Sequence, residues 1–238
     1  MRIRLPLGRT LFLTAFFLFA LVALLPMRLA LDSFGFAERG LTARAATGSV
    51  WLGALREAQV GPVALGDVRA RLNLLPLLLG RARLTLAGAD ANSPFEGAAT
   101  VSRHRFGFED VSGRFRIAGL SSPLAISSLD FQDVSVGFAG GRCTRAEGRV
   151  RAGIAGDAAG IGFASGLAGN ARCANDALLL PLASQTGTER LDIRLFADGR
   201  YRLDLLVRTG DEAVRARLIA AGLRPVGRGY GMQVGGRF

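Results

Sequence analysis

Apolar and polar residues alternate in short stretches along most of this chain. From Val50 onward, apolar residues recur at every second position, and Gly, Asp or Pro interrupts them about every ten to fifteen residues. The 32 glycines among 238 residues favour short strands and tight turns over long helices. One apolar face along many strands implies a sheet that curls around its own lining. We therefore predict a mainly all-β fold: a curved, antiparallel, partly open sheet or half-barrel with one short C-terminal helix.

The clearest strand pair lies within residues 190–208. A three-residue loop, Ala197 to Gly199, pairs Leu195 with Tyr201 and keeps the apolar residues of both strands on one face, which a two-residue loop would split. The longer loop also puts Gly199 at the left-handed position that such turns require. This register places like charges opposite each other, which is unfavourable unless diagonal pairs form: Arg194 with Arg202, and Asp192 with Asp204.

Two irregular strands and one helix are also predicted. The apolar residues change parity at Glu109-Asp110, and a second change near Gln132-Asp133 indicates a bulge. Thr209 and Glu212 fit a capping box at the start of a helix, and Gly222 lies where that helix should end.

An uncharged apolar run near the N-terminus predicts a membrane anchor. The run extends over eighteen residues from Thr10 to Met27, close to the length that crosses ~30 Å of hydrocarbon as a helix. Three basic residues precede it and are predicted to hold the N-terminus in the cytoplasm: Arg2, Arg4 and Arg9. We expect residues 1–31 to form a basic cytoplasmic stub with a single transmembrane anchor. Residues 32–238 are then a β domain on the other side of the membrane.

A cleaved signal peptide would have the same charge layout. Its apolar core usually has about seven to fifteen residues and ends at a cleavage site flanked by small residues. Here Pro26, Met27 and Arg28 occupy that place. The uncleaved anchor is therefore favoured, and both interpretations put the body in the same compartment.

The two cysteines, Cys143 and Cys173, predict a disulfide, because a translocated domain with an even number of cysteines is usually oxidised. Closing this loop would stabilise the fold by roughly 3 to 4 kcal/mol. Two free, buried thiols are the alternative. The only histidine, His104, is far away in the sequence, so we expect no metal site.

The net charge of +11 does not by itself indicate nucleic-acid binding. Every Lys or Arg position is Arg, and Ala and Gly are also abundant, which is typical of a genome-wide composition bias. The arginines alternate with apolar residues as solvent-facing positions of strands do, whereas a nucleic-acid surface concentrates its charge in a patch. Attraction to anionic lipid head groups is a better use of this charge.

No catalytic arrangement is found in the sequence. His104 alternates with Phe106 and Phe108, which is typical of a strand residue, and no second histidine could serve a hydrolase. The glycine-rich stretches lack the Lys and the strand-turn-helix setting of a phosphate loop. We expect no enzymatic activity and no cofactor.

Several short motifs follow one another in a distinctive order. They are Gly48-Ser49-Val50-Trp51-Leu52-Gly53, then Val60, Leu65-Gly66 and Val68, then Leu74-Leu75-Pro76-Leu77-Leu78-Leu79-Gly80-Arg81, and finally Gly141-Arg142-Cys143. A second cysteine, a hairpin, a helix and a Gly-rich strand complete the order. This succession resembles type II secretion system protein N, also called general secretion pathway protein N. The resemblance covers nearly the whole chain.

The resemblance implies a single-pass inner-membrane protein with a periplasmic domain, in the machinery that exports folded proteins through the outer membrane. It implies other inner-membrane secretion subunits as partners, and no catalytic residues. It also implies kinship with the AsmA-like group, whose curved sheets have apolar grooves thought to handle lipids.

Two functions remain open. The chain could act by docking, through sheet edges or its transmembrane helix, on other secretion subunits. Alternatively, it could bind or transfer phospholipid on an apolar concave sheet face. A closed core favours docking, and an open apolar trough favours lipid. Three residues are candidates for a groove or an interface: Trp51, for which a position in a strand core is the alternative, Phe106 and Phe108.

Overall fold

The computed structural model describes residues 7–28, 41–60, 63–89, 94–117, 126–154, 157–158, 161–162 and 166–237. The helices are α1 (Leu7–Ala23), α3 (Leu74–Leu78) and α4 (Glu212–Ala220). The first strands are β1 (Leu41–Thr42), β2 (Ala45–Ser49), β3 (Leu52–Val60), β4 (Val63–Leu72), β5 (Ala82–Gly88), β6 (Phe95–Ser102), β7 (Arg105–Ile117), β8 (Ile126–Ala139) and β9 (Arg142–Ile154). The later strands are β10 (Asp157–Ala158), β11 (Ile161–Gly162), β12 (Leu167–Asn170), β13 (Arg172–Ala174), β14 (Ala177–Ala183), β15 (Glu189–Leu195), β16 (Arg200–Val207), β17 (Arg224–Val226) and β18 (Gly229–Arg237).

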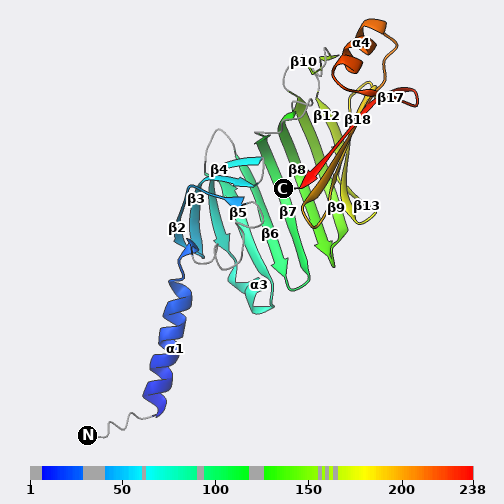
Figure 1. Ribbon diagram of the computed structural model, residues 1–238. Coiled ribbons are helices and arrows are strands. Elements are labelled where there is room, and N and C mark those ends of the chain that lie inside the picture. The colour runs from blue at the N-terminus through cyan, green and yellow to red at the C-terminus, as the bar shows by residue number, and fades with distance from the viewer. Residues whose placement is uncertain are drawn as a thin grey trace.

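Within these ranges, sixteen strands form a single antiparallel sheet, and β10 and β11 form a separate pair (Figure 1). The order in the sheet is β1-β3-β4-β5-β6-β7-β8-β9-β12-β14-β15-β16-β18-β17, with β2 paired to β3 and β13 to β14. Neighbours in the sheet are mostly neighbours in the chain, because short turns join antiparallel strands. The predicted all-β, antiparallel fold is confirmed.

The register places apolar residues on one face across the sheet. Residues directly opposite on paired strands point to the same side. One such row runs across six strands through Leu72, Leu84, Ala99, Phe108, Val136 and Ala146. Another crosses the C-terminal strands through Leu182, Leu191, Leu205 and Met232. We call the side that bears these rows the apolar face, and the opposite side, which bears Arg69, Arg71, Arg114, Arg151 and Arg190, the arginine face.

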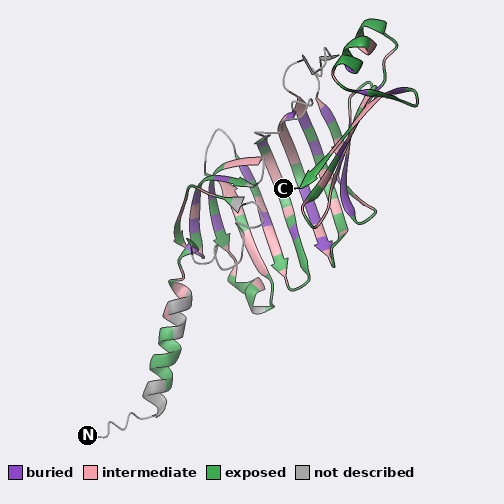
Figure 2. Cartoon of the chain, in the orientation of Figure 1, coloured by how far each residue is buried: buried purple, intermediate pink, exposed green. Residues whose placement is uncertain are grey.

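The buried side chains form two clusters. Figure 2 marks buried residues in both the N-terminal and the C-terminal strands. The N-terminal cluster consists of Met27, Leu55, Ala58, Val68, Ala70, Phe95 and Phe115. The C-terminal cluster is larger and consists of Ile126, Val134, Val136, Phe138, Val150, Ala152, Leu167, Ala171, Leu178, Leu180, Leu182, Leu191, Ile193, Leu203, Leu205, Val207, Leu218 and Leu223. Residues of β8 and β16 share the C-terminal cluster, so the sheet turns back on itself there. Phe131 packs against both clusters.

The predicted hairpin is confirmed in its register. Leu195 pairs with Tyr201, Ile193 with Leu203 and Leu191 with Leu205. The loop is the three-residue version, and Gly199 has φ +83°. The like charges do lie opposite each other, and Arg194 forms the diagonal ion pair with Asp204 that relieves them.

Both predicted parity changes are confirmed. At each place the strand pairing shifts in register, and one residue has a left-handed backbone conformation. Asp110 has φ +52° and Asp133 has φ +50°, and the ladders shift at both places. The buried Ser135 holds the first of these bulges, because its Oγ accepts a hydrogen bond from the Asp110 N–H at 3.0 Å. These bulges keep the apolar residues before and after them on one face.

The C-terminal helix lies where it was predicted, but its cap differs. The side chain of Asp211, and not Thr209, caps α4, since its Oδ1 accepts hydrogen bonds from the N–H groups of Ala213 and Val214. Asp211 adopts the extended backbone of an N-cap residue, and Glu212 begins the helix. Gly222, with φ +90°, follows the helix as predicted.

The apolar N-terminal run is helical over part of its length. α1 ends at Ala23, Pro26 forms a bridge with Ser49, and Met27 is buried in the N-terminal cluster. Within the part of the chain that the structure describes, no helix is both long enough and apolar enough to cross a membrane. Arg2 and Arg4 lie outside the described residues.

Candidate functional site

An exposed apolar strip interrupts the otherwise covered apolar face. It consists of Val101, Phe106 and Phe108, which expose 40%, 40% and 49% of their surface. Val101 lies directly opposite Phe106, and the Phe106 ring stacks on that of Phe138 with centroids 5.0 Å apart. The two candidate phenylalanines therefore share one surface, at the end of β7 that follows the β6–β7 turn.

The other end of β7 is covered. There Phe115 packs between Phe95 and Phe131, with ring centroids 5.4 and 5.3 Å apart. β4 also pairs with β7 at this end, through Val63 and Ile117, because the hairpin between them is too short to separate them. The apolar face of the N-terminal strands is thus closed at one end and exposed at the end that bears the strip.

The other candidate residues lie in turns. Trp51 is half-buried in the turn between β2 and β3, not in a strand core, and β4, β5 and β6 separate its strand from Phe106 and Phe108 in the sheet order. His104 is exposed in the β6–β7 turn, so its expected strand position is wrong. The spacing of two residues between His104, Phe106 and Phe108 predicted one strand. The strand begins only at Arg105, and His104 keeps the same spacing although it lies in the turn before it.

Sequence reasoning missed a second group of exposed apolar side chains. α3 connects β4 to β5 and exposes Leu74, Leu75 and Leu77, and Leu79 follows it. In the sequence this segment is one of the motifs of the family resemblance, and it predicts no exposed surface. Its signal was the run of leucines between Asn73 and Gly80, a length too short for a periodicity argument.

One edge of the sheet is open over most of a strand. β17 pairs only with residues 229–231 of β18, so the outer edge of residues 232–237 has no partner strand among the described residues. Pro225 lies opposite Tyr230 and has no N–H, so the hydrogen bonds between β17 and β18 run through the flanking pairs. Odd-numbered residues of β18, including Gln233 and Gly235, therefore turn their N–H and C=O groups outward.

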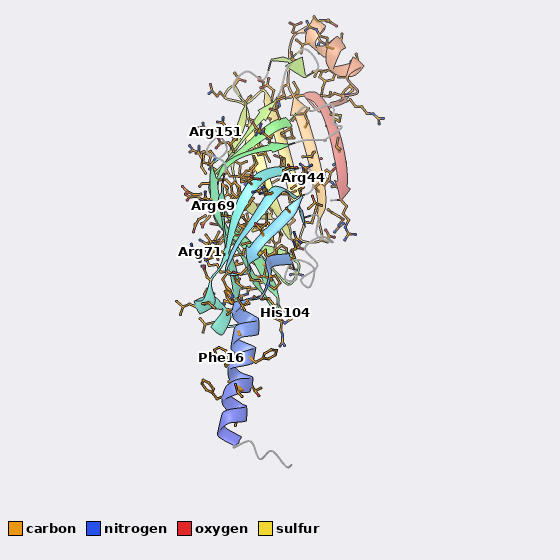
Figure 3. All side chains as sticks on the ribbon, turned by 90° about the vertical axis from the view of Figure 1, so that its left-hand side faces the viewer. Phe16, Arg44, Arg69, Arg71, His104 and Arg151 are labelled. Carbon is orange, nitrogen blue, oxygen red and sulfur yellow. A yellow bond between two sulfur atoms is a disulfide. The ribbon has the colours of Figure 1, made fainter. Side chains whose placement is uncertain are left out.

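The arginine face bears arginines without a carboxylate partner among the described residues. Figure 3 shows Arg69, Arg71 and Arg151 on the same side of the sheet. None of these three forms an ion pair with a described carboxylate. Elsewhere on this face Arg83 pairs with Glu109 at 2.8 Å, so the charge is spread along the strands and only partly neutralised.

The two cysteines form a disulfide, as predicted. Cys143 at the start of β9 and Cys173 in β13 are joined, with Cα atoms 5.5 Å apart. The bond holds β13, which pairs with β14, beside the start of β9. In the described residues no group of three His, Cys, Asp or Glu could hold a metal ion.

The hairpin turn between β15 and β16 holds a carboxylate with a shifted pKa. The Arg200 N–H donates to Asp198 Oδ1 at 3.1 Å, and its guanidinium donates to Oδ2 at 2.6 Å. These bonds stabilise the anion, so the pKa of Asp198 is lowered from its usual value, with the backbone bond as the larger cause. The role of this carboxylate is local to the turn.

The sheet thus has an apolar face that is exposed at one strip, and an open edge at β18. Comparison with known families shows which family this sequence matches. The family model of type II secretion system protein N matches residues 39–231. The chain belongs to this family. No curated protein and no solved structure matches, so the expected kinship of the family with AsmA-like proteins rests on no comparison. The protein is thus a type II secretion component whose matched segment covers nearly all of the sheet.

Proposed function

We propose that this chain is an inner-membrane-anchored, periplasmic component of the type II secretion machinery that acts by docking other subunits and not by catalysis. The family match over residues 39–231 carries the proposal, because it relates the sheet itself to protein secretion. Membership favours interaction with other secretion components. The open edge of the sheet favours docking as the mode of interaction.

The membrane anchor is supported by the surface of α1. Every side chain from Leu11 to Phe17 is exposed, and all except Thr14 are apolar. Such a surface is unfavourable in water and favourable in hydrocarbon. The disulfide between Cys143 and Cys173 fits an oxidising compartment for the body. A reporter fused after Phe238 tests this topology: periplasmic activity is expected, and a cytosolic reporter would overturn the proposed location.

The open edge of β18 is the proposed docking element. An unpaired strand edge presents a row of N–H and C=O groups that accept an extended segment of another chain. The outward groups of Gln233 and Gly235 are available for this pairing. The edge strands at the other end of the sheet, β1 and β2, are only two and five residues long, so they offer less backbone.

A pull-down from membranes with the full-length chain tests this element. Gly235→Pro removes an outward N–H while the bonds between β16 and β18 remain, so co-purification of secretion subunits should be lost. Gly235→Ala is the matched control, because an added Cβ would meet only the Tyr201 carbonyl oxygen at 3.4 Å. Equal recovery of subunits with both variants would rule out docking through this edge.

Lipid binding is the second candidate function, favoured by the exposed strip of Val101, Phe106 and Phe108. Each buried CH₂ of an acyl chain contributes about 0.8 kcal/mol, so a short contact with the strip suffices to hold it. Native mass spectrometry of the detergent-free protein body checks this. Co-purifying phospholipid that is lost in Phe106→Ser/Phe108→Ser supports lipid handling, and recovery of a secretion subunit without lipid supports docking alone.

A further inference from the structure

Five exposed leucines gather at one end of the sheet. They form what we call the leucine edge: Leu52, Leu74, Leu75, Leu77 and Leu79. Leu75 and Leu79 each expose 79% of their surface, more than any residue of the exposed strip. Contiguous exposed apolar side chains of this kind mark a surface that contacts a partner or a membrane.

The leucine edge is fixed to the end of α1. The Val50 N–H donates to the Leu25 carbonyl at 3.0 Å, and the Leu72 N–H donates to the Val50 carbonyl at 3.4 Å. Asn73, which precedes α3, donates its N–H to the Arg83 carbonyl at 2.9 Å. These backbone bonds connect the segment that follows α1 with the segment that precedes α3, and Figure 1 shows α3 at the lower end of the sheet, the side from which α1 projects.

The charges around the leucine edge are all of one sign. Its leucines and the adjoining turns lie in residues 49–52, 73–81 and 102–105, and these segments contain no Asp or Glu. They contain three arginines, Arg81, Arg103 and Arg105, all of them exposed. Val101 lies opposite Ala82, so the β6–β7 turn is next to the end of the α3 connection. Apolar side chains ringed by arginine match a layer of acyl chains beneath anionic head groups.

We infer that the leucine edge inserts into the interfacial layer of the membrane that holds α1, with anionic phospholipid as its partner. This goes beyond docking and rests on the proposed attachment of α1. The protein then contacts the bilayer at two places, α1 and the leucine edge. The end of the sheet that bears α3 therefore faces the membrane. The exposed strip then opens close to the membrane surface, since Phe106 follows the same turn as Arg103 and Arg105.

Site-directed fluorescence on the full-length chain tests the inference. The two native cysteines are joined, so an introduced cysteine is the only one that reacts with a thiol-specific dye. Leu75→Cys reports on α3, Phe16→Cys on α1, and Val226→Cys, an exposed residue of β17, is the matched control. Each labelled protein is reconstituted in vesicles of phosphatidylcholine and phosphatidylglycerol that carry nitroxide quenchers on their acyl chains.

We expect the dyes at residues 75 and 16 to be quenched and the dye at 226 to remain bright. Leu74→Glu/Leu79→Glu should reduce quenching at residue 75 to the level of residue 226 and leave residue 16 unchanged. Quenching at residue 16 with none at residue 75 would overturn the inference and keep the anchor. Absence of quenching at both residues would overturn the anchor as well.

Discussion

The two halves of the sheet share one sequence pattern and differ in how their apolar face is covered. In the C-terminal half, β8 to β18, the sheet turns back and buries eighteen residues in one cluster. The buried cluster of the N-terminal half, β1 to β7, has only seven residues, and the strip of Val101, Phe106 and Phe108 stays exposed. Alternation therefore determines which side chains share a face, and the path of the later strands determines which of them are covered.

The difference suggests that the two halves have different roles. The C-terminal half has a disulfide, a capped helix and the larger of the two buried clusters. The N-terminal half bears α1, α3 and the exposed strip, so its apolar surface is available to lipid or to another chain. Predictions that separate the two halves test this interpretation directly.

Removal of the disulfide should have the largest effect. Cys143→Ser/Cys173→Ser frees a separation of 30 residues, and the chain-entropy estimate gives a loss of about 3 to 4 kcal/mol in the free energy of unfolding. Hydrogen exchange measured along the chain should show faster exchange in β9 to β16 and little change in β3 to β6. Equal acceleration in both halves would show that they unfold as one unit, coupled through Phe131.

Two substitutions to alanine compare how well side chains are buried in the two halves. Leu191→Ala, at a fully buried site, should lower the free energy of unfolding by about 3 kcal/mol, because it leaves a cavity in the C-terminal cluster. Phe108→Ala removes a larger side chain but should cost about 1 kcal/mol or less, since half of that side chain already contacts solvent. Urea unfolding of both variants is the measurement. A larger cost for Phe108→Ala would mean that the strip is covered in solution.

Local rules predicted the C-terminal half well. The register of the hairpin follows from keeping Leu195 and Tyr201 on one face, and Gly199 and Gly222 mark conformations that other residues rarely adopt. The N-terminal half was predicted less well, because its features depend on long-range packing. Met27 is buried, and the α3 leucines are exposed, because of the strands that lie next to them in the fold. The sequence pattern within these segments does not predict either outcome.

The cap of α4 offers a smaller test of the C-terminal half. Asp211→Ala should lower the free energy of unfolding by about 1 kcal/mol, because two N–H groups at the start of the helix lose their acceptor. Thr209→Ala should cost less, since the Thr209 hydroxyl accepts only the Asp211 N–H at 3.1 Å. Thermal unfolding of the two variants compares them directly. The reverse order would restore the capping box that the sequence predicted.

The smallest expected effect is a pH dependence at the hairpin turn of the C-terminal half. Bonds from Arg200 hold the pKa of Asp198 below its unfolded value, so this carboxylate contributes stability above that unfolded value. The contribution should be lost as the pH falls from about 4 through the lowered folded pKa. Asp198→Asn should therefore destabilise the protein slightly at neutral pH and differ less from the parent in acid, as urea unfolding at several pH values would show. A difference that grows in acid would mean that the protonated side chain, and not the anion, is what the turn holds.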